Sequence, residues 1–273
     1  MKKITEILQL CQNKNYNSIL VHCITNPISI NQCANIVIAA GANPIMAEHP
    51  DEVAEITKMS DALLINTGNI TDTRMKSFKI SANTANNLNI PIIIDIVGAS
   101  CSTLRLNYIK NFLKDYKVDI IKGNMSEIKA LLGYNYSSHG IDVSENDKIN
   151  DYNLKNSVLI AKNLAQKYNT TVMITGKYDI IADFKSSFVI RNGNSNLSKL
   201  TGTGCMLGAL TAVYMKFLKS LNAAILACVY LSIAGDNSIY KGPESYLSDI
   251  LDNIYSLSPE ILEEKADIIE YRS

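Results

Sequence analysis

The segment that decides the fold is Pro91-Ile92-Ile93-Ile94-Asp95, in which three isoleucines follow one another and an acid ends the run. β-Branched apolar residues without polar alternation are typical of a strand buried on both faces, as in a parallel sheet. Similar short apolar runs lie at residues 18–21, 62–66, 118–121 and 171–175. Their repetition predicts a central sheet whose strands are mostly parallel.

The stretches between these runs are long enough to connect parallel strands. Residues 71–88, 104–116 and 153–168 are amphipathic, and each predicts a crossover helix. Residues 134–151 are rich in Ser, Asn and Asp and predict a surface loop. The fold class is therefore α/β, a three-layer α/β/α sandwich with a mostly parallel central sheet, and we expect a single domain over residues 1–273.

The pattern changes after the last of the apolar runs. Residues 177–190 predict a hairpin of two shorter strands. From Thr203 onward the chain is mainly helical, with a predicted break at residues 220–222 and a second helix that ends near Tyr240. Both helices are apolar over wide faces, so we expect them to pack against the sheet.

The composition excludes several classes of protein. Apolar residues make up 47% of the chain, and 26 basic residues balance 26 acidic ones without a basic block. Disorder, a nucleic-acid partner and an anionic membrane surface are therefore not indicated. Six cysteines are scattered without a CxxC pair, and no signal peptide or membrane-spanning run is visible, so we expect a cytoplasmic protein without zinc or disulfides.

The glycine-rich segment Thr201-Gly202-Thr203-Gly204-Cys205 comes directly before a long helical stretch. Glycines allow close approach of the backbone, and the free N–H groups of a helix start favour an anion such as a phosphate. The alternative is a glycine turn with Thr201 or Thr203 as N-cap, which the segment taken alone favours at least as well.

Cys205 falls in the first turn of this helix, a position that favours a reactive thiolate. The three histidines are far away along the chain, so a Cys/His nucleophilic hydrolase would require tertiary contact. The alternative is a small buried cysteine.

Polar residues end several of the predicted strands, where open parallel sheets bind ligands. Asp95 ends one strand, and Lys122-Gly123-Asn124-Met125-Ser126-Glu127 follows another. Acids at these places suit Mg²⁺ held through water, whereas Asn124 and Glu127 also fit a capping box. Thr175 ends a further strand, where a nucleotide contact and a simple turn are equally compatible with the residues.

These segments together resemble the hydroxyethylthiazole kinase family of the ribokinase-like superfamily. The resemblance covers the chain from about residue 18 to the C-terminal helices. It rests on the following segments in this order: His22-Cys23-Ile24-Thr25-Asn26, residues 39–47, Leu64-Ile65-Asn66-Thr67-Gly68, residues 95–99, residues 122–127 and residues 201–205.

The resemblance implies that Mg-ATP donates its γ-phosphoryl group to the hydroxyl of 4-methyl-5-(2-hydroxyethyl)thiazole in thiamine salvage. It also implies a homotrimer with active sites between subunits. The implied site residues are Met46, Gly202, Asn26 and Ile28 for the substrate, Lys122 and Thr175 for ATP, Asp95 and Glu127 for Mg²⁺ through water, and Cys205, Gly202, Thr203 and Gly204 for catalysis, with Cys205 beside the attacking hydroxyl.

Three positions depart from the family pattern. Ile96 stands where Pro is usual, Lys122 stands where Arg is usual, and Pro27 is an unusual neighbour of the substrate segment. Lysine keeps the charge of arginine but loses its bidentate fork. The alternatives are a hydroxymethylpyrimidine or pyridoxal kinase, a nicotinamide-nucleotide-hydrate dehydratase, and a non-catalytic nucleotide or thiazole sensor.

Overall fold

A computed structural model describes residues 2–134 and 147–271 of the chain. One sheet of nine strands runs through it, in the order β2-β1-β3-β4-β5-β6-β7-β8-β9. The strands are β1 (Leu20–Ile24), β2 (Asn43–Ile45), β3 (Ala62–Asn66), β4 (Ile92–Asp95), β5 (Ile120–Asn124), β6 (Thr171–Thr175), β7 (Asp179–Ala182), β8 (Ser187–Ile190) and β9 (Ile268–Glu270).

The strands β1, β3, β4, β5 and β6 pair in parallel, as the apolar runs predicted. The short edge strand β2, which pairs in parallel with β1, was not predicted from the sequence. The hairpin predicted at residues 177–190 is confirmed by β7 and β8, which continue the sheet in antiparallel pairing. The last strand, β9, pairs antiparallel with β8 and was not predicted from the sequence. Its three residues are too short to give a pattern of their own.

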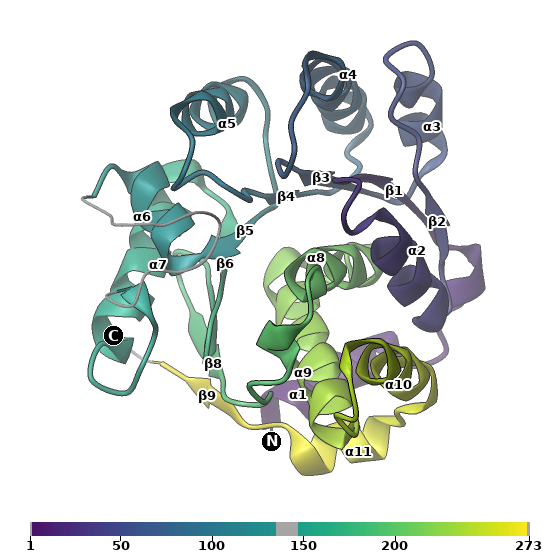
Figure 1. Cartoon of the computed structure of the whole chain (residues 1–273), viewed down its shortest axis with the longest axis vertical. Helices are drawn as coiled ribbons and strands as arrows, with labels where there is room; N and C mark the ends of the chain where they lie inside the picture. The colour runs from purple at the N-terminus through teal and green to yellow at the C-terminus, as the bar shows by residue number, and fades with distance from the viewer. Residues whose placement is uncertain (1, 135–146, 272–273) are drawn as a thin grey trace.

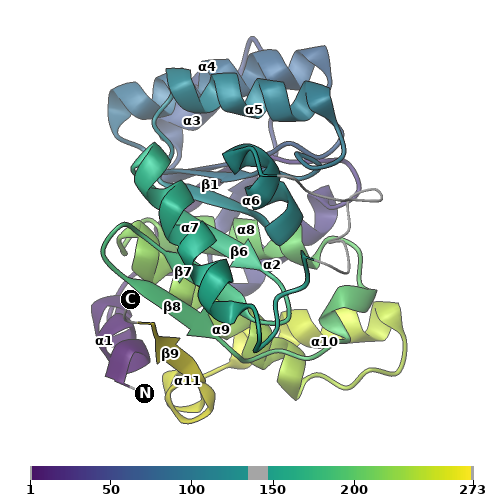
Figure 2. The same cartoon turned by 90° about the vertical axis from the view of Figure 1, so that its left-hand side faces the viewer.

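Helices cover both faces of the sheet, and the three layers are visible in Figure 1. On one face lie α3 (Val53–Met59), α4 (Asp72–Leu88), α5 (Thr103–Asp115), α6 (Met125–Leu132) and α7 (Leu154–Tyr168). On the other face lie α1 (Lys2–Cys11), α2 (Ile30–Ala39), α8 (Thr203–Tyr214), α9 (Ser220–Asn237), α10 (Pro243–Ser256) and α11 (Pro259–Lys265). Figure 2 shows the same layers from the side, with α4 and α5 on one side of the sheet and α8 and α9 on the other.

Two apolar cores therefore form, one on each face of the sheet. Alternate residues of a strand enter opposite cores: Leu64 of β3 lies in the core on the side of α8, whereas Leu63 and Ile65 lie in the core on the side of α4. Burial on both faces is the reason why the strands read as continuous apolar runs.

The three crossover helices lie within a residue of their predicted bounds, because local signals mark their ends. Thr71 caps α4 by accepting a hydrogen bond from the amide of Arg74, and Asn89 ends that helix at a left-handed φ of 56°. The predicted helix break is misplaced: α8 ends at Tyr214 and α9 already begins at Ser220. Both helices are apolar all round, so hydrophobicity alone did not locate the break.

Most of the predicted loop at residues 134–151 lies outside the described residues. Within residues 2–134 and 147–271, no helix is both long and apolar enough to cross a bilayer. All six cysteines are free thiols.

Candidate active site

A buried ion pair occupies the carboxyl edge of the sheet. Asp95 ends β4 and lies opposite Lys122 of β5 in the parallel register. The Nζ of Lys122 donates a hydrogen bond of 2.9 Å to Oδ2 of Asp95. The side chains of Asp95 and Lys122 are only 1% and 3% exposed. A charge-assisted bond is required here, because an unpaired charge in such a place costs several kcal/mol, about 3–5 when one partner is removed.

The buried environment changes the ionisation of both partners. Burial raises the pKa of Asp95 from its ordinary value, and the ammonium of Lys122 opposes that shift. Burial alone lowers the pKa of Lys122, but the carboxylate of Asp95 raises it above its ordinary value. Lys122 is therefore a permanent cation at neutral pH.

A second buried acid, Glu127, stands beside this pair. Its Oε1 accepts a hydrogen bond of 2.8 Å from the amide of Gly98, and its Oε2 accepts one of 2.8 Å from the amide of Asn124. The side chain of Asn124 accepts in turn from the amide of Glu127, which completes the capping box predicted from the sequence. Burial and the negative charge of Asp95 raise the pKa of Glu127 to about 7.

These acids fit a divalent cation held through water. Asp95 and Glu127 bring two carboxylates against the single ammonium of Lys122, which leaves an excess of buried negative charge when all three are ionised. In the part of the chain that the structure describes, no group of three or more His, Cys, Asp or Glu side chains forms a direct metal cage. A hard cation that keeps most of its water shell is compatible with this arrangement.

The glycine-rich segment begins α8 directly above the ion pair. Gly202, and not Thr201 or Thr203, is the N-cap, with a left-handed φ of 94°. This backbone conformation favours glycine, and a Cβ there would also lie 3.3 Å from Cβ of Ser29. A Cβ on Gly204 would lie 3.6 Å from Nζ of Lys122. The positive end of α8 and a buried ammonium therefore share one place, which is suited to an anion.

Cys205, in the first turn of α8, is half-buried and faces two amide side chains. Asn26 and Asn66 each donate from Nδ2 to its sulfur, at 3.4 and 3.2 Å. Asn66 also donates to Oδ2 of Asp95 at 3.2 Å. A continuous chain of hydrogen bonds thus links Lys122 through Asp95 and Asn66 to Cys205. No histidine takes part in the contacts of this sulfur that the structure describes, so the arrangement does not support the Cys/His alternative.

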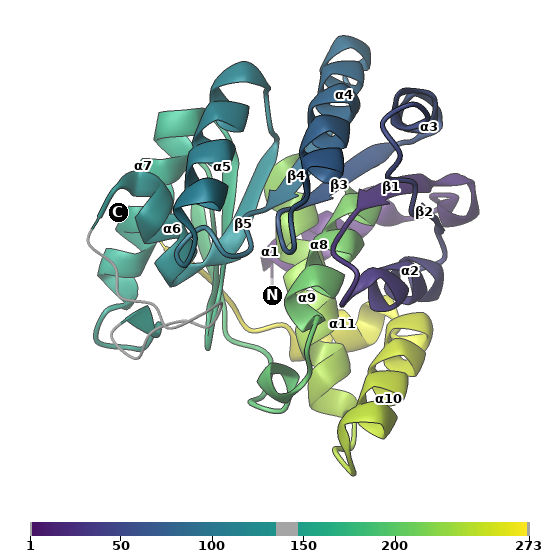
Figure 3. The same cartoon turned by 45° about the horizontal axis from the view of Figure 1, so that its top comes forward.

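The remaining predicted residues lie around the same edge. Thr175 ends β6 opposite Asn124 of β5. Met46 follows β2, is half-buried and packs against the core. Ile28, in the loop before α2, is 57% exposed. Figure 3 shows this loop and α2 on the same side of the sheet as α8.

His22 supports the segment that carries Met46. Its Nε2 lies 2.9 Å from the carbonyl of Ala47, which can only accept, and its Nδ1 lies 2.9 Å from Oγ1 of Thr57. Nε2 must therefore carry the proton, and Nδ1 accepts from the threonine. Burial lowers the pKa of His22 to about 4, so the ring is neutral.

Sequence reasoning missed Asn66 and His22 as functional candidates. Asn66 ends β3 at the carboxyl edge, His22 lies in the middle of β1, and both are fully buried. Asn66 ends a buried apolar run in the same way as Asp95, which is the signal that could have found it. His22 has no such signal, because its partners Ala47 and Thr57 are 25 and 35 residues away in sequence.

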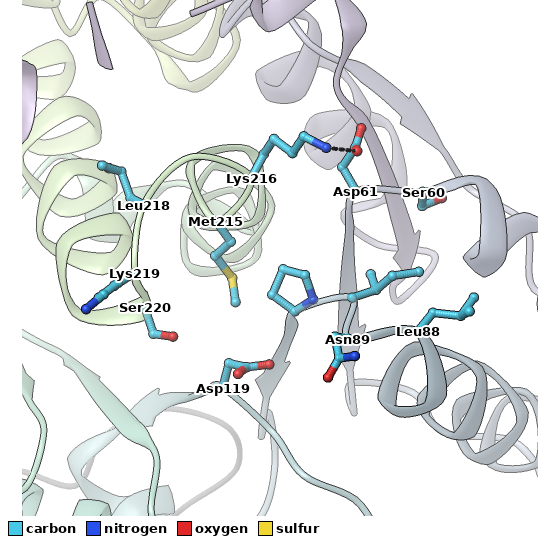
Figure 4. Close-up of a pocket in the computed structure, with 12 residues that line it drawn as sticks. Ser60, Asp61, Leu88, Asn89, Asp119, Met215, Lys216, Leu218, Lys219 and Ser220 are labelled. Carbon is cyan, nitrogen blue, oxygen red and sulfur yellow. Dashed lines mark hydrogen bonds and ion pairs between the residues drawn. The ribbon is translucent and has the colours of Figure 1, made fainter. Parts of the chain in front are cut away.

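A cavity of about 490 Å³ lies at the opposite, amino edge of the sheet (Figure 4). Asp61 and Lys216 form an ion pair of 2.6 Å at its rim. Asp61 accepts from the amide of Leu20 and Asp119 from the amide of Ile92, so these acids complete the starts of strands. The cavity does not coincide with the buried charges of Asp95, Lys122 and Glu127, and we place the site with the charges.

The fold and this site define a phosphotransferase of the ribokinase-like class. A structure of the pyridoxal kinase from Staphylococcus aureus in complex with ADP shares the fold, with a TM-score of 0.64 at 14% identity over 93% of this chain and 99% of that one. A structure titled hydroxyethylthiazole kinase protein, from Pyrococcus horikoshii, superposes with a TM-score of 0.87 at 31% identity over the whole of both chains.

The sequence comparisons narrow this class to one family. A family model described as the hydroxyethylthiazole kinase family matches residues 11–260. Hydroxyethylthiazole kinase 2 of Clostridium botulinum (strain Langeland) is 45% identical over 97% of this chain and 100% of its own length. Hydroxyethylthiazole kinase of Clostridium acetobutylicum is 39% identical over 92% of this chain and 95% of its own. The chain belongs to the hydroxyethylthiazole kinase family and is a kinase, as the sequence motifs predicted.

Proposed function

We propose that this kinase transfers the γ-phosphoryl group of ATP to the hydroxyl of 4-methyl-5-(2-hydroxyethyl)thiazole, a step of thiamine salvage. The observation that carries the proposal is the position of Lys122 Nζ beneath Gly204 at the start of α8. Family membership supplies the substrates, and this geometry supplies a place where the transferring phosphoryl group meets fixed positive charge.

ATP contacts are assigned to Lys122 and Thr175. The ammonium of Lys122 is a point charge without a fork, so it neutralises phosphate oxygens and leaves their orientation to the backbone N–H groups of the glycine-rich segment. Thr175 is the last residue of β6 and is half-buried, at the carboxyl edge where we expect the nucleotide to cross.

Mg²⁺ is assigned to Asp95 and Glu127 through water. When bound, the ion neutralises charge that develops on the phosphate oxygens. Oδ2 of Asp95 accepts hydrogen bonds from Lys122 and Asn66, and each carboxylate oxygen of Glu127 accepts one from a backbone amide. Both acids are therefore held in place before any ligand enters, which is the preorganisation that electrostatic catalysis needs.

The acceptor is placed against Met46, Gly202 and Ile28, with its hydroxyl beside Cys205. A thiol must first lose its own proton before it can act as a general base. We therefore assign catalysis to positioning and electrostatics by Gly202, Thr203, Gly204 and Lys122, with Cys205 marking the place of the hydroxyl.

We further infer one kinase domain over residues 1–273, a homotrimer with active sites between subunits, and a cytoplasmic location. The continuous nine-stranded sheet supports the single domain. The exposed Ile28, in the loop that also carries Asn26, supports a subunit interface next to the site. Sedimentation velocity should give three times the chain mass of 30.1 kDa.

The test is ADP release with a panel of alcohols in the presence of Mg-ATP. The thiazole alcohol should be phosphorylated far faster than hydroxymethylpyrimidine or pyridoxal. Preference for one of the other two would move the assignment to another ribokinase-like kinase, and no turnover with any alcohol would favour a sensor. Cys205 argues against the dehydratase, for which Asp is expected at this position.

A further inference from the structure

We propose that Asn26 and Asn66 are positioning residues. Each donates a hydrogen bond to the side chain of residue 205, and the two bonds together hold that side chain beside the reacting hydroxyl. The proposal rests on the proposed function for the identity of the acceptor. It gives Asn26 a role other than the substrate contact expected from the motif, and it adds Asn66 to the site.

The orientation of both amides follows from backbone groups that can only donate. Oδ1 of Asn66 accepts from the amide of Gly68 at 2.8 Å, so its Nδ2 must face Asp95 and Cys205. Oδ1 of Asn26 accepts from the amides of Ile28 and Ser29 at 3.1 and 3.2 Å, so its Nδ2 must face the sulfur as well. Flipping either amide would place oxygen against oxygen or N–H against N–H.

All hydrogen-bond donors and acceptors of both side-chain amides are also occupied by protein groups. The two N–H groups of Asn26 serve Asn66 Oδ1, at 3.2 Å, and Cys205, while its oxygen takes two backbone amides. Asn66 gives one N–H to Asp95 and one to Cys205, and its oxygen takes Gly68 and Asn26. An amide has two donors and two acceptor sites, so nothing remains for a substrate.

The sulfur therefore receives two fixed donors from the protein side. Because its lone pairs accept from the two amides, a neutral thiol can interact with the substrate hydroxyl only by donating its S–H group. The same pair of donors would suit a carboxylate even better, because hydrogen bonds to an ionised acceptor are about twice as strong. The site is thus built to accept an anion at position 205, although a thiol occupies it.

Steady-state kinetics of Asn66→Ala in three backgrounds tests the role. We expect kcat to fall about tenfold in the parent enzyme, about 100-fold in Cys205→Asp, and least in Cys205→Ala, where no acceptor remains. The contact of Asn66 with Asp95 is lost in all three backgrounds and cancels in the comparison. KM for the thiazole alcohol should change less than about twofold.

Asn26→Asp is the second variant, because it keeps the oxygen that accepts from Ile28 and Ser29 but loses both N–H donors. It should lower kcat without raising KM for the alcohol. Asn86→Ala is the matched control: this amide also bridges two backbone groups, the carbonyl and amide of Lys117, each at 2.9 Å, but far from the site. It should leave kcat unchanged.

Equal losses of kcat in the three backgrounds, or a large rise in KM for the alcohol, would overturn the positioning role. Urea unfolding of the Asn66→Ala and Cys205→Ala single and double variants provides a readout without turnover. Non-additive midpoint shifts support the amide–sulfur bond, and additive shifts contradict it. A parent enzyme inactive on the alcohol would contradict the proposed function and leave the unfolding cycle to decide the contacts.

Discussion

The two edges of the same parallel sheet carry acids of the same kind in opposite circumstances. At the amino edge, Asp61 and Asp119 stand before strands, accept backbone amides and border an open cavity. At the carboxyl edge, Asp95 ends a strand, is 1% exposed and binds a buried ammonium. The cavity lies at the first edge, and the buried ion pair lies at the second.

The difference teaches that space is a weaker sign of function than desolvated charge. The acids at the amino edge accept hydrogen bonds from the first amides of neighbouring strands. Their side chains stay partly exposed, so they keep contact with water and are not fully desolvated. Burying Asp95, Lys122 and Glu127 costs free energy that folding alone does not require. Such groups gather where a reaction needs fixed charges, and perturbed pKa values there are the usual consequence.

The largest effect should come from removing the buried cation. In Lys122→Met, Asp95 is left uncompensated, and we expect the free energy of unfolding to fall by about 3–5 kcal/mol. Kinase activity should fall with it, because no ammonium then faces the start of α8. Urea denaturation and ADP release measure the two effects. A variant as stable as the parent would contradict the strength of the pair.

The next effect concerns the pH dependence that His22 imposes. Its pKa is about 4 in the folded protein and about 6.5 when unfolded, so between these values the unfolded state binds more protons. Stability contributed by the neutral ring is present above pH 6.5 and is lost as pH falls towards 4. Between pH 6.5 and pH 5 the loss should be about 2 kcal/mol.

His22→Asn removes this titration, so its unfolding free energy should fall less over the same pH interval. Chemical denaturation at four pH values measures the slopes. Equal slopes for the two proteins would show that His22 is not held neutral.

A smaller effect is expected for the thiol. Cys205→Ala should lower kcat about tenfold or less, and Cys205→Asp should preserve or raise it, because positioning and fixed charge carry the reaction. Initial rates at saturating ATP measure both. Complete loss of turnover in Cys205→Ala, with alcohol binding intact, would show instead that the thiol is indispensable.

The smallest effect belongs to the amino edge. Lys216→Met breaks the 2.6 Å pair with Asp61, whose lysine is 43% exposed, and should cost about 0–1 kcal/mol. It is the matched control for Lys122→Met, since the substitution is the same and only the burial differs. Activity should be unchanged, and a loss comparable to that of Lys122→Met would remove the distinction between the edges.

Much of this fold could be predicted, because strands that are buried on both faces consist of continuous apolar runs that are visible in the sequence. The predicted bounds failed where the strands continue through buried polar residues. The run at residues 18–21 became β1 (Leu20–Ile24), which contains His22, and the run at residues 118–121 became β5 (Ile120–Asn124), which contains Lys122. Hydrophobicity ends at such residues, but the strand does not.

The site divides in the same way. The place of Asp95 at the end of its strand and the capping box of Asn124 and Glu127 could be predicted, since each follows from residues a few positions away. The contacts of Asn66 with Asp95 and of Asn26 with Cys205 span 29 and 179 residues of sequence. No local pattern encodes such pairs, so the amide support of Cys205 became visible only in the folded chain.

The central claim is that the buried charges of the carboxyl edge, and not the open cavity of the amino edge, carry phosphoryl transfer. The most direct test compares ADP release by Asp95→Asn and Asp61→Asn with that of the parent enzyme, using the thiazole alcohol and Mg-ATP. We predict a loss of roughly 100-fold or more for Asp95→Asn and a rate within about twofold of the parent for Asp61→Asn. A parental rate in Asp95→Asn, or its loss in Asp61→Asn, would contradict the account.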